Sequence, residues 1–152
     1  MKKALSAAAT LAVLLAAVLA VHAQARSAAE AAALKSLDEY MAAFNSRDAK
    51  AWAQTLHYPH VRIASGQVRV WQTPEEYVRD FDFSAFAERE SWHHSAWSKR
   101  EIIQTSADKV HVAVSFTRFD AQNQPVSSYE SLYVVTEKDG HWGTQARSSF
   151  AP

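Results

Sequence analysis

Side chains capable of acid–base chemistry are concentrated in LHYPHVRIAS, residues 56–65. The segment contains His57, Tyr58 and His60, and Arg62 follows two residues later. An imidazole has an ordinary pKa of roughly 6.5, so it can donate or accept a proton near neutral pH. One of the two histidines is therefore a candidate general acid or base, with Tyr58 as a hydrogen-bond donor. Alternatively, His57 bonds the last carbonyls of a short helix and His60 lies on the outer face of a strand.

Three charged side chains fall within strongly apolar stretches, where an unpaired charge would be costly. They are Arg118, Glu130 and Arg147. If neighbouring strands pair, the three could form a cross-strand cluster whose guanidinium groups hold a carboxylate or polarise a substrate oxygen. We group Arg118 with the catalytic candidates, and Glu130 and Arg147 with the ligand-binding candidates. The alternative is an Arg–Glu–Arg ladder on an outer sheet face, in water or against a second subunit.

Several aromatic side chains are candidates to line a pocket. Tyr40, Trp71, Trp97 and Tyr129 are spread over the chain. Aromatic rings around a cavity favour flat, apolar ligands, although the tryptophans fit the core and the rim of a domain equally well. The expected ligand is a small apolar molecule.

Metal and cofactor signals are weak. His93 and His94 are adjacent on an expected strand, so they point to opposite faces and at most one can reach a pocket. One of them could join His57 and His60 as metal ligands, but no carboxylate stands at a convincing spacing. Asp82 is the one acid expected near the mouth of a pocket. With no Cys and no Gly-rich phosphate loop, we expect neither a metal nor a cofactor.

The first 25 residues, MKKALSAAATLAVLLAAVLAVHAQA, have the pattern of a secretory signal: two lysines, an apolar run, then small residues. We expect cleavage after Ala25, or alternatively after Ala23, and a periplasmic or secreted location without membrane attachment. An uncleaved anchor is the second interpretation, because the apolar run is close to the minimum length of a membrane span.

Composition then restricts the class of the mature protein. Removing 25 of the 152 residues leaves 127, enough for one domain with a single core. Loss of Lys2 and Lys3 takes the 16 basic residues to 14 against 16 acidic ones, so nucleic acid is not an expected partner. The absence of Cys excludes disulfides and leaves stability to a core rich in aromatic residues.

Local patterns predict three helices before the main sheet. Ser27–Glu30 fits a capping box and, with the apolar spacing that follows, predicts a helix from about residue 28 to 45. Asp48 is the expected cap of a short helix that carries Trp52 and Leu56 and stops before Pro59. Thr73 and Pro74 begin a third helix, which should fray near Phe86.

The remainder is predicted to be strand. Residues 60–65 and 67–72 alternate around Gly66, as expected for a hairpin. Four long strands then follow, over residues 92–105, 109–120, 126–137 and 141–150. The Asp139-Gly140 break is the strongest hairpin signal in the chain. Consecutive strands joined by short turns predict an α+β domain, with the helices first and an antiparallel sheet after them.

This order of elements, with the segments LDEYMAAFNSRDAKAWAQTLHYPHVRI, TPEEY, FTRFD and DGHWGTQARSSF, resembles the SnoaL-like branch of the nuclear transport factor 2-like superfamily. The resemblance covers residues 26–152 and implies a cone-like, curved antiparallel sheet wrapped by the three N-terminal helices, with an apolar pocket at its open end. It also implies that Tyr40 projects into the cone and that the protein forms a homodimer. Relatives include cofactor-independent isomerases, dehydratases and cyclases, as well as binding and assembly domains without catalysis. We therefore expect an exported small-molecule-binding domain with histidine acid–base chemistry, or alternatively a non-catalytic binding or dimerisation module.

Overall fold

The computed structural model describes residues 2–152, with side chains from residue 20 onward. The helices are α1 (Lys2–Asn45), α2 (Ala49–Gln54), α3 (Pro74–Arg79) and α4 (Phe83–Glu90). The strands are β1 (Leu56–Ala64), β2 (Gln67–Trp71), β3 (His94–Thr105), β4 (Lys109–Phe119), β5 (Pro125–Lys138) and β6 (His141–Ser149).

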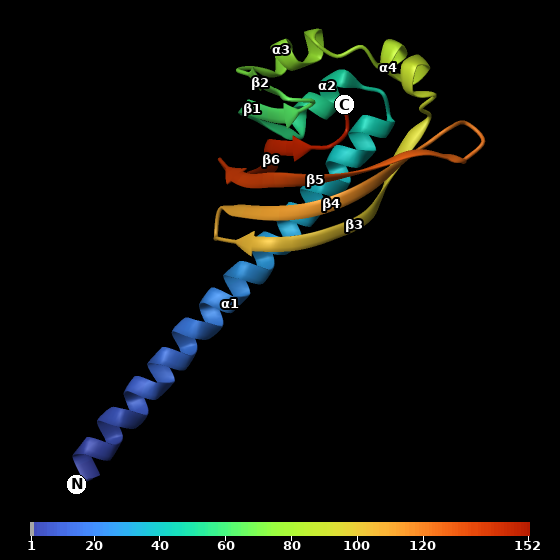
Figure 1. The fold of residues 1–152 in the computed structure, drawn as a ribbon. Coiled ribbons are helices and arrows are strands. Elements are labelled where there is room, and N and C mark those ends of the chain that lie inside the picture. The colour runs from blue at the N-terminus through green and yellow to red at the C-terminus, as the bar shows by residue number, and fades with distance from the viewer. Residues whose placement is uncertain (1) are drawn as a thin grey trace.

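The strands form one curved sheet in the order β2-β1-β6-β5-β4-β3. The C-terminal part of α1 packs on one face of this sheet, and α3 and α4 lie at the end of the molecule near β1 and β2 (Figure 1). The predicted α+β class and curved sheet are confirmed. The sheet is mixed rather than purely antiparallel, because β1 pairs with β6 in parallel. This long-range pairing returns the end of the chain to the middle of the sheet.

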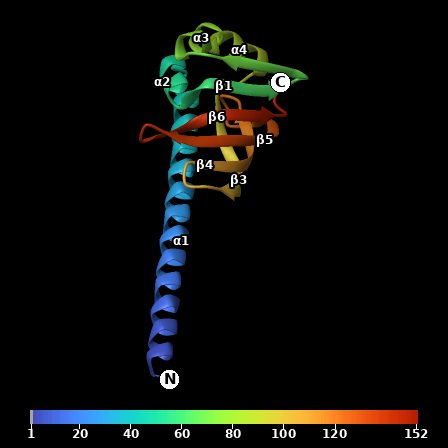
Figure 2. The ribbon, with the colours of Figure 1, turned by 90° about the vertical axis from the view of Figure 1, so that its left-hand side faces the viewer.

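The first helix begins earlier than predicted. It runs through the expected capping box, where the Ser27 hydroxyl donates to the Gln24 carbonyl at 3.1 Å, but it ends at Asn45 as expected. Residues 20–28 are exposed, and burial against the sheet begins at Ala29. Figure 2 shows the N-terminal part of α1 extending away from the sheet. None of the helices in the described part of the chain is long and apolar enough to cross a membrane.

The second helix is shorter than predicted. Asp48 caps α2 by accepting hydrogen bonds from the Lys50 and Ala51 N–H groups, but the helix ends at Gln54. Leu56, expected on this helix, pairs instead with Thr144 of β6. The chain is therefore already extended at His57, and the expectation that His57 bonds the last carbonyls of a helix is wrong.

The predicted third helix is two helices. α3 ends at Arg79, and Asp82 begins α4 by accepting hydrogen bonds from the Ser84 and Ala85 N–H groups. The apolar pattern alone suggested one continuous helix. A side chain that accepts hydrogen bonds from free N–H groups stabilises the start of a second helix inside that range. The break directs α4 over the sheet, where its last residue, Glu90, reaches β4.

The strands determine which side chains face inward. Val110, Val112, Val114 and Arg118 of β4 are buried, with Phe116 half-buried between the last two, and Tyr133 and Val135 of β5 are buried as well. Because successive side chains of a strand point to opposite faces, this period fixes the inner face of the long hairpin. Predicted turns at Gly66 and Asp139-Gly140 are confirmed, each with two consecutive residues of positive φ, as type I′ hairpins require.

Candidate functional site

An open cavity of about 560 Å³ lies between the inner face of the sheet and helices α1, α3 and α4. Much of its wall is aromatic, including Tyr40, Trp52, Trp71, Tyr77, Trp97 and Tyr133. Its charged lining consists of five arginines and two aspartates among the described residues. A cavity of this size and composition suits a small flat molecule with polar substituents.

Arg147 of β6 is the most unusual group in the cavity wall. Its Nη2 donates to the Tyr77 hydroxyl at 2.8 Å, and its Nη1 donates to the Tyr40 hydroxyl. Its guanidinium carbon lies 5.5 Å from the ring centroid of Trp52, a cation–π distance. Tyr133 stands opposite Arg147 across the β5–β6 pairing. In the part of the chain with described side chains, Arg147 has no carboxylate partner.

The charges of this group are fixed by its surroundings. Burial raises the pKa of Tyr40 well above its ordinary value. Burial also raises the pKa of Tyr77 to about 12, against the opposing effect of the Arg147 charge. Burial alone would lower the pKa of Arg147, but its interactions with Tyr40, Tyr77 and Tyr133 more than offset this and raise it. Near neutral pH this group therefore consists of the Arg147 cation and neutral phenols.

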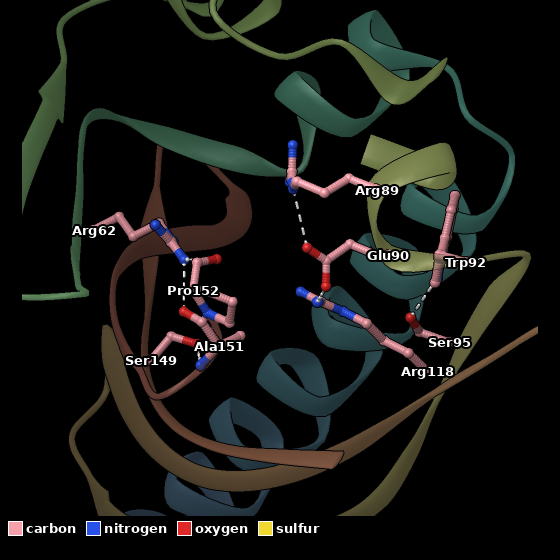
Figure 3. A network of polar contacts seen from close by, with 9 residues as sticks. All are labelled: Arg62, Arg89, Glu90, Trp92, Ser95, Arg118, Ser149, Ala151 and Pro152. Carbon is pink, nitrogen blue, oxygen red and sulfur yellow. Dashed lines mark hydrogen bonds and ion pairs between the residues drawn. The ribbon is translucent and has the colours of Figure 1, made fainter. Parts of the chain in front are cut away.

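A second arginine in the wall is already neutralised. Arg118, only 5 % exposed, donates from Nη1 to Glu90 of α4 at 2.6 Å, and Arg89 donates to the same carboxylate at 3.1 Å (Figure 3). Its guanidinium lies 4.8 Å from the ring centroid of Tyr129. Burial lowers the pKa of Arg118, and Glu90 opposes this effect. Arg118 lines the cavity as predicted, but its partner is Glu90 rather than Glu130.

Arg62 organises another part of the wall. Its Nη2 donates to the main-chain oxygens of Ala151 and Pro152 at 2.9 and 3.0 Å, as Figure 3 shows. Ala151 and Pro152 thereby become part of the cavity lining. Burial lowers the pKa of Arg62, and the nearby Arg147 charge lowers it further.

His60 does not reach the cavity. The residue is fully buried, with its ring packed against Trp71 and Tyr77, and its Nδ1 lies 3.0 Å from the Thr144 carbonyl. Only a protonated Nδ1 can bond a carbonyl, so Nε2 is the unprotonated nitrogen of the neutral ring. Burial, together with the Arg147 charge, lowers the pKa of His60 to about 3. His60 and Arg62 are two residues apart on β1, so both side chains point to the inner face of the sheet. Of the two, only Arg62 lines the cavity.

His57 and Tyr58 also lie outside the cavity lining. His57 contacts the Thr136 hydroxyl through Nδ1 at 2.8 Å and His141 through Nε2 at 3.1 Å. The Tyr58 hydroxyl donates to the Ala53 carbonyl at 3.0 Å. Burial raises the pKa of Tyr58 and lowers that of His57. The prediction that one of these histidines enters the cavity beside Tyr58 is therefore wrong, and their packing explains the crowding in LHYPHVRIAS.

The remaining candidates divide between the two faces of the sheet. Tyr40, Trp71, Trp97 and Arg147 line the cavity. Tyr129 points inward against Arg118 without being part of the lining. Glu130 is exposed on the opposite face, beside a separate hollow that contains Leu132 and Phe150, so its expected place in the binding site is wrong.

Asp82 borders the cavity as expected while it caps α4. His93 and His94 stand next to each other, with Nδ1 atoms 3.3 Å apart, away from the lining. Among the residues with described side chains, no group of three or more His, Cys, Asp or Glu could hold a metal ion.

The residues of the site that were not among the sequence candidates include Arg62, Tyr77, Glu90 and Tyr133. Tyr133 could have been found, because it lies four residues after Tyr129 and so shares its strand face. Tyr77 lies on α3 and Glu90 on α4, two short helices where the apolar pattern predicts one. No local sequence pattern predicts that Tyr77 and Glu90 reach the site.

A curved sheet around an aromatic cavity, with helices closing one side, is the arrangement of an NTF2-like fold. The family model described as NTF2-like protein (DUF6841) matches residues 29–146, and the chain belongs to this family. A comparison with curated proteins gives no match.

Solved structures share this fold at low sequence identity. An NTF2-like protein with a cystatin-like fold from Novosphingobium aromaticivorans has 11% identity and a TM-score of 0.66, covering 90% of this chain and 86% of that chain. A protein from Catenulispora acidiphila in complex with S-DNPA has 17% identity and a TM-score of 0.65, with coverages of 82% and 94%. A ketosteroid isomerase-like protein from Erwinia carotovora atroseptica has 22% identity and a TM-score of 0.55, with coverages of 80% and 96%.

Proposed function

We propose that this domain binds a small, flat, largely apolar molecule in the cavity. The observation that carries the proposal is the aromatic wall around about 560 Å³, within the range of volumes typical of small-molecule sites. Trp97 supports it further, because its ring packs near Tyr40 and Tyr133 and presents an extended aromatic surface. A structural neighbour from Catenulispora acidiphila was obtained with a bound ligand, S-DNPA, which is in keeping with a binding role for this fold.

Binding fits the lining better than isomerase, dehydratase or cyclase chemistry. Such reactions need a general acid or base beside the substrate, and no histidine lines the cavity in the described part of the chain. The lining carboxylates are Asp80 and Asp82, and both are engaged. Asp80 accepts a hydrogen bond from the Trp71 indole at 3.1 Å, and Asp82 caps α4. A catalytic role would therefore fall to one of these two aspartates.

Binding can be tested with N-phenyl-1-naphthylamine, a neutral aromatic dye whose fluorescence rises in apolar surroundings. The protein should bind it saturably in one-to-one stoichiometry. Ala85 is exposed at the cavity wall, so Ala85→Trp should fill the opening and weaken binding at least about tenfold. Ser84→Trp, one residue earlier and outside the lining, is the matched control and should leave binding unchanged. Equal binding by both variants would contradict the use of this cavity.

We also propose export with removal of residues 1–25. The proposal rests on the leader pattern, and it is supported by the exposure of residues 20–28 and by burial that begins only at Ala29. Residues 20–25, whose side chains are described, are all exposed, so their removal would cost the domain little packing. The intact mass of protein recovered from the periplasm of a bacterial host tests this directly, since cleavage after Ala25 leaves a chain that starts at Arg26.

A homodimer through the outer sheet face is proposed as well. Phe150 is 81% exposed and Leu132 is 40% exposed, and both border the same hollow on that face. Exposed large apolar side chains that share a patch favour association. Sedimentation at micromolar concentration should show a dimer, and Leu132→Glu should shift it to monomer. A wild-type monomer would contradict the proposal.

A further inference from the structure

The charge of Arg147 lacks a counter-ion in the cavity wall. Its Nη atoms are bonded to the Tyr40 and Tyr77 hydroxyls, and its Nε is buried with no hydrogen-bond partner among the described residues. A guanidinium has five N–H donors, so these bonds leave donors unused. A cation held this way by neutral groups is costly unless something else compensates it.

The neighbouring groups do not supply that compensation. Tyr40 and Tyr77 stay neutral because burial raises the pKa of each phenol. The Glu90 carboxylate is taken by Arg118 and Arg89. Stacking of the guanidinium on aromatic rings offsets only part of the cost of burying the charge.

The two lining aspartates are also occupied elsewhere. Asp80 accepts hydrogen bonds from the Trp71 indole and from Arg79, and Asp82 accepts them from two N–H groups of α4. Arg89 and Arg118 share the Glu90 carboxylate, and the other three lining arginines face only these two aspartates among the described residues, so the lining carries an excess of positive charge. The cavity therefore favours a ligand that brings negative charge with it.

We infer that the ligand is an aromatic acid whose anionic oxygens bind Arg147 together with the hydroxyls of Tyr40 and Tyr77. This inference rests on the proposed binding function and specifies the chemical class of its ligand. A guanidinium suits planar oxyanions such as carboxylates, and can bind two of their oxygens at once. The Tyr77 oxygen accepts a hydrogen bond from Arg147, so the Tyr77 O–H can donate to the same oxyanion, whereas the Tyr40 hydroxyl also interacts with Tyr133. The aromatic wall then holds the ring of the ligand.

A matched pair of dyes tests the inference. The probe 8-anilinonaphthalene-1-sulfonate is N-phenyl-1-naphthylamine with one added sulfonate, so the two differ by a single anionic group. Fluorescence titration of the wild-type protein should show at least about tenfold tighter binding of the sulfonate dye. The preference should fall as ionic strength rises.

Substitutions locate the charge that is responsible. Arg147→Met should weaken binding of the sulfonate dye at least about tenfold and abolish the preference over the neutral dye. Tyr77→Phe retains the packed ring and removes only the hydroxyl, so it should weaken sulfonate binding about threefold or more, even if Arg147→Met fails to fold. Lys109→Met removes an exposed positive charge outside the cavity and should leave both affinities unchanged.

Each outcome separates the inference from the proposed function. Equal affinity of the wild-type protein for both dyes would overturn the inference and leave the binding function in place. A sulfonate preference that survives in both Arg147→Met and Tyr77→Phe would also overturn it, since another cation would then be responsible. Failure of both dyes to bind would overturn the proposed function itself.

Discussion

Arg147 on β6 donates a hydrogen bond of 2.8 Å to the hydroxyl of Tyr77 on α3, although the two residues are 70 positions apart in the chain. This contact connects the sheet to a short helix beside the cavity, and the same guanidinium also bonds Tyr40 of α1. One arginine thereby joins three separate elements around a space open to ligands. The cost of its uncompensated charge points to a role in binding rather than in stability.

The Arg118–Glu90 pair, by contrast, should stabilise the fold. Glu90→Gln would leave Arg118, with 6% of its side chain exposed, without the carboxylate that balances its charge. Loss of one partner of a buried ion pair is strongly destabilising, and we expect the free energy of unfolding to fall by about 2–4 kcal/mol. Urea denaturation measures this change. Glu88→Gln, exposed on the same helix, is the control and should cost less than about 0.5 kcal/mol.

His60 predicts a specific loss of stability in mild acid. Its pKa of about 3 in the folded protein lies below the ordinary value of roughly 6.5, so the unfolded chain binds a proton that the folded chain does not. The destabilisation caused by His60 is absent above pH 6.5 and grows as the pH falls from 6.5 toward 3. Over this range it lowers the free energy of unfolding by about 1.4 kcal/mol per pH unit.

His60→Asn places an amide that can still donate to the Thr144 carbonyl but does not titrate. Between pH 6.5 and 5, the free energy of unfolding of His60→Asn should therefore fall less steeply with pH than that of the wild type. The two slopes should differ by about 1.4 kcal/mol per pH unit, the value for one proton. Above pH 7.5 the two slopes should agree, which serves as the internal control. Parallel curves throughout would mean that His60 is not held neutral by burial.

Gly143 should be intolerant of any side chain, because His57 occupies the adjacent space. A Cβ at this position would lie 2.9 Å from Cδ2 of His57 and 3.2 Å from the Thr55 carbonyl oxygen. Gly143→Ala should therefore cost about 1–3 kcal/mol of stability, measured by thermal or urea unfolding. In a double-mutant cycle with His57→Ala, the two effects should be less than additive. Full additivity would show that the imidazole is not the obstacle.

Local sequence signals predicted those parts of the fold that depend on neighbours in the chain. Gly66 and Asp139-Gly140 form hairpin turns because their residues adopt positive φ at low cost. The C-terminal end of α1 at Asn45 also follows from the pattern. The parallel pairing of β1 with β6 has no such local cause, since it joins segments more than 80 residues apart.

The site was only partly predictable because side-chain faces depend on strand register. Arg118 pairs with Ser127, and Glu130 lies three positions further along β5, an odd step that turns it to the outer face. Tyr133 lies an even number of positions from Ser127, the partner of Arg118, so it shares the inner face with Arg118. Because Tyr133 also stands opposite Arg147, both arginines point to this face. Residue types thus identified Arg118 and Arg147, but only the register decides which charges can meet.

The most direct test of the central claim is a crystal structure of the protein with 8-anilinonaphthalene-1-sulfonate. We predict the dye in the cavity, with its rings against Trp97 and Tyr133 and its sulfonate within hydrogen-bonding distance of Arg147 and the Tyr77 hydroxyl. A dye bound on the outer sheet face near Phe150, or one in the cavity with its sulfonate directed away from Arg147, would contradict the account.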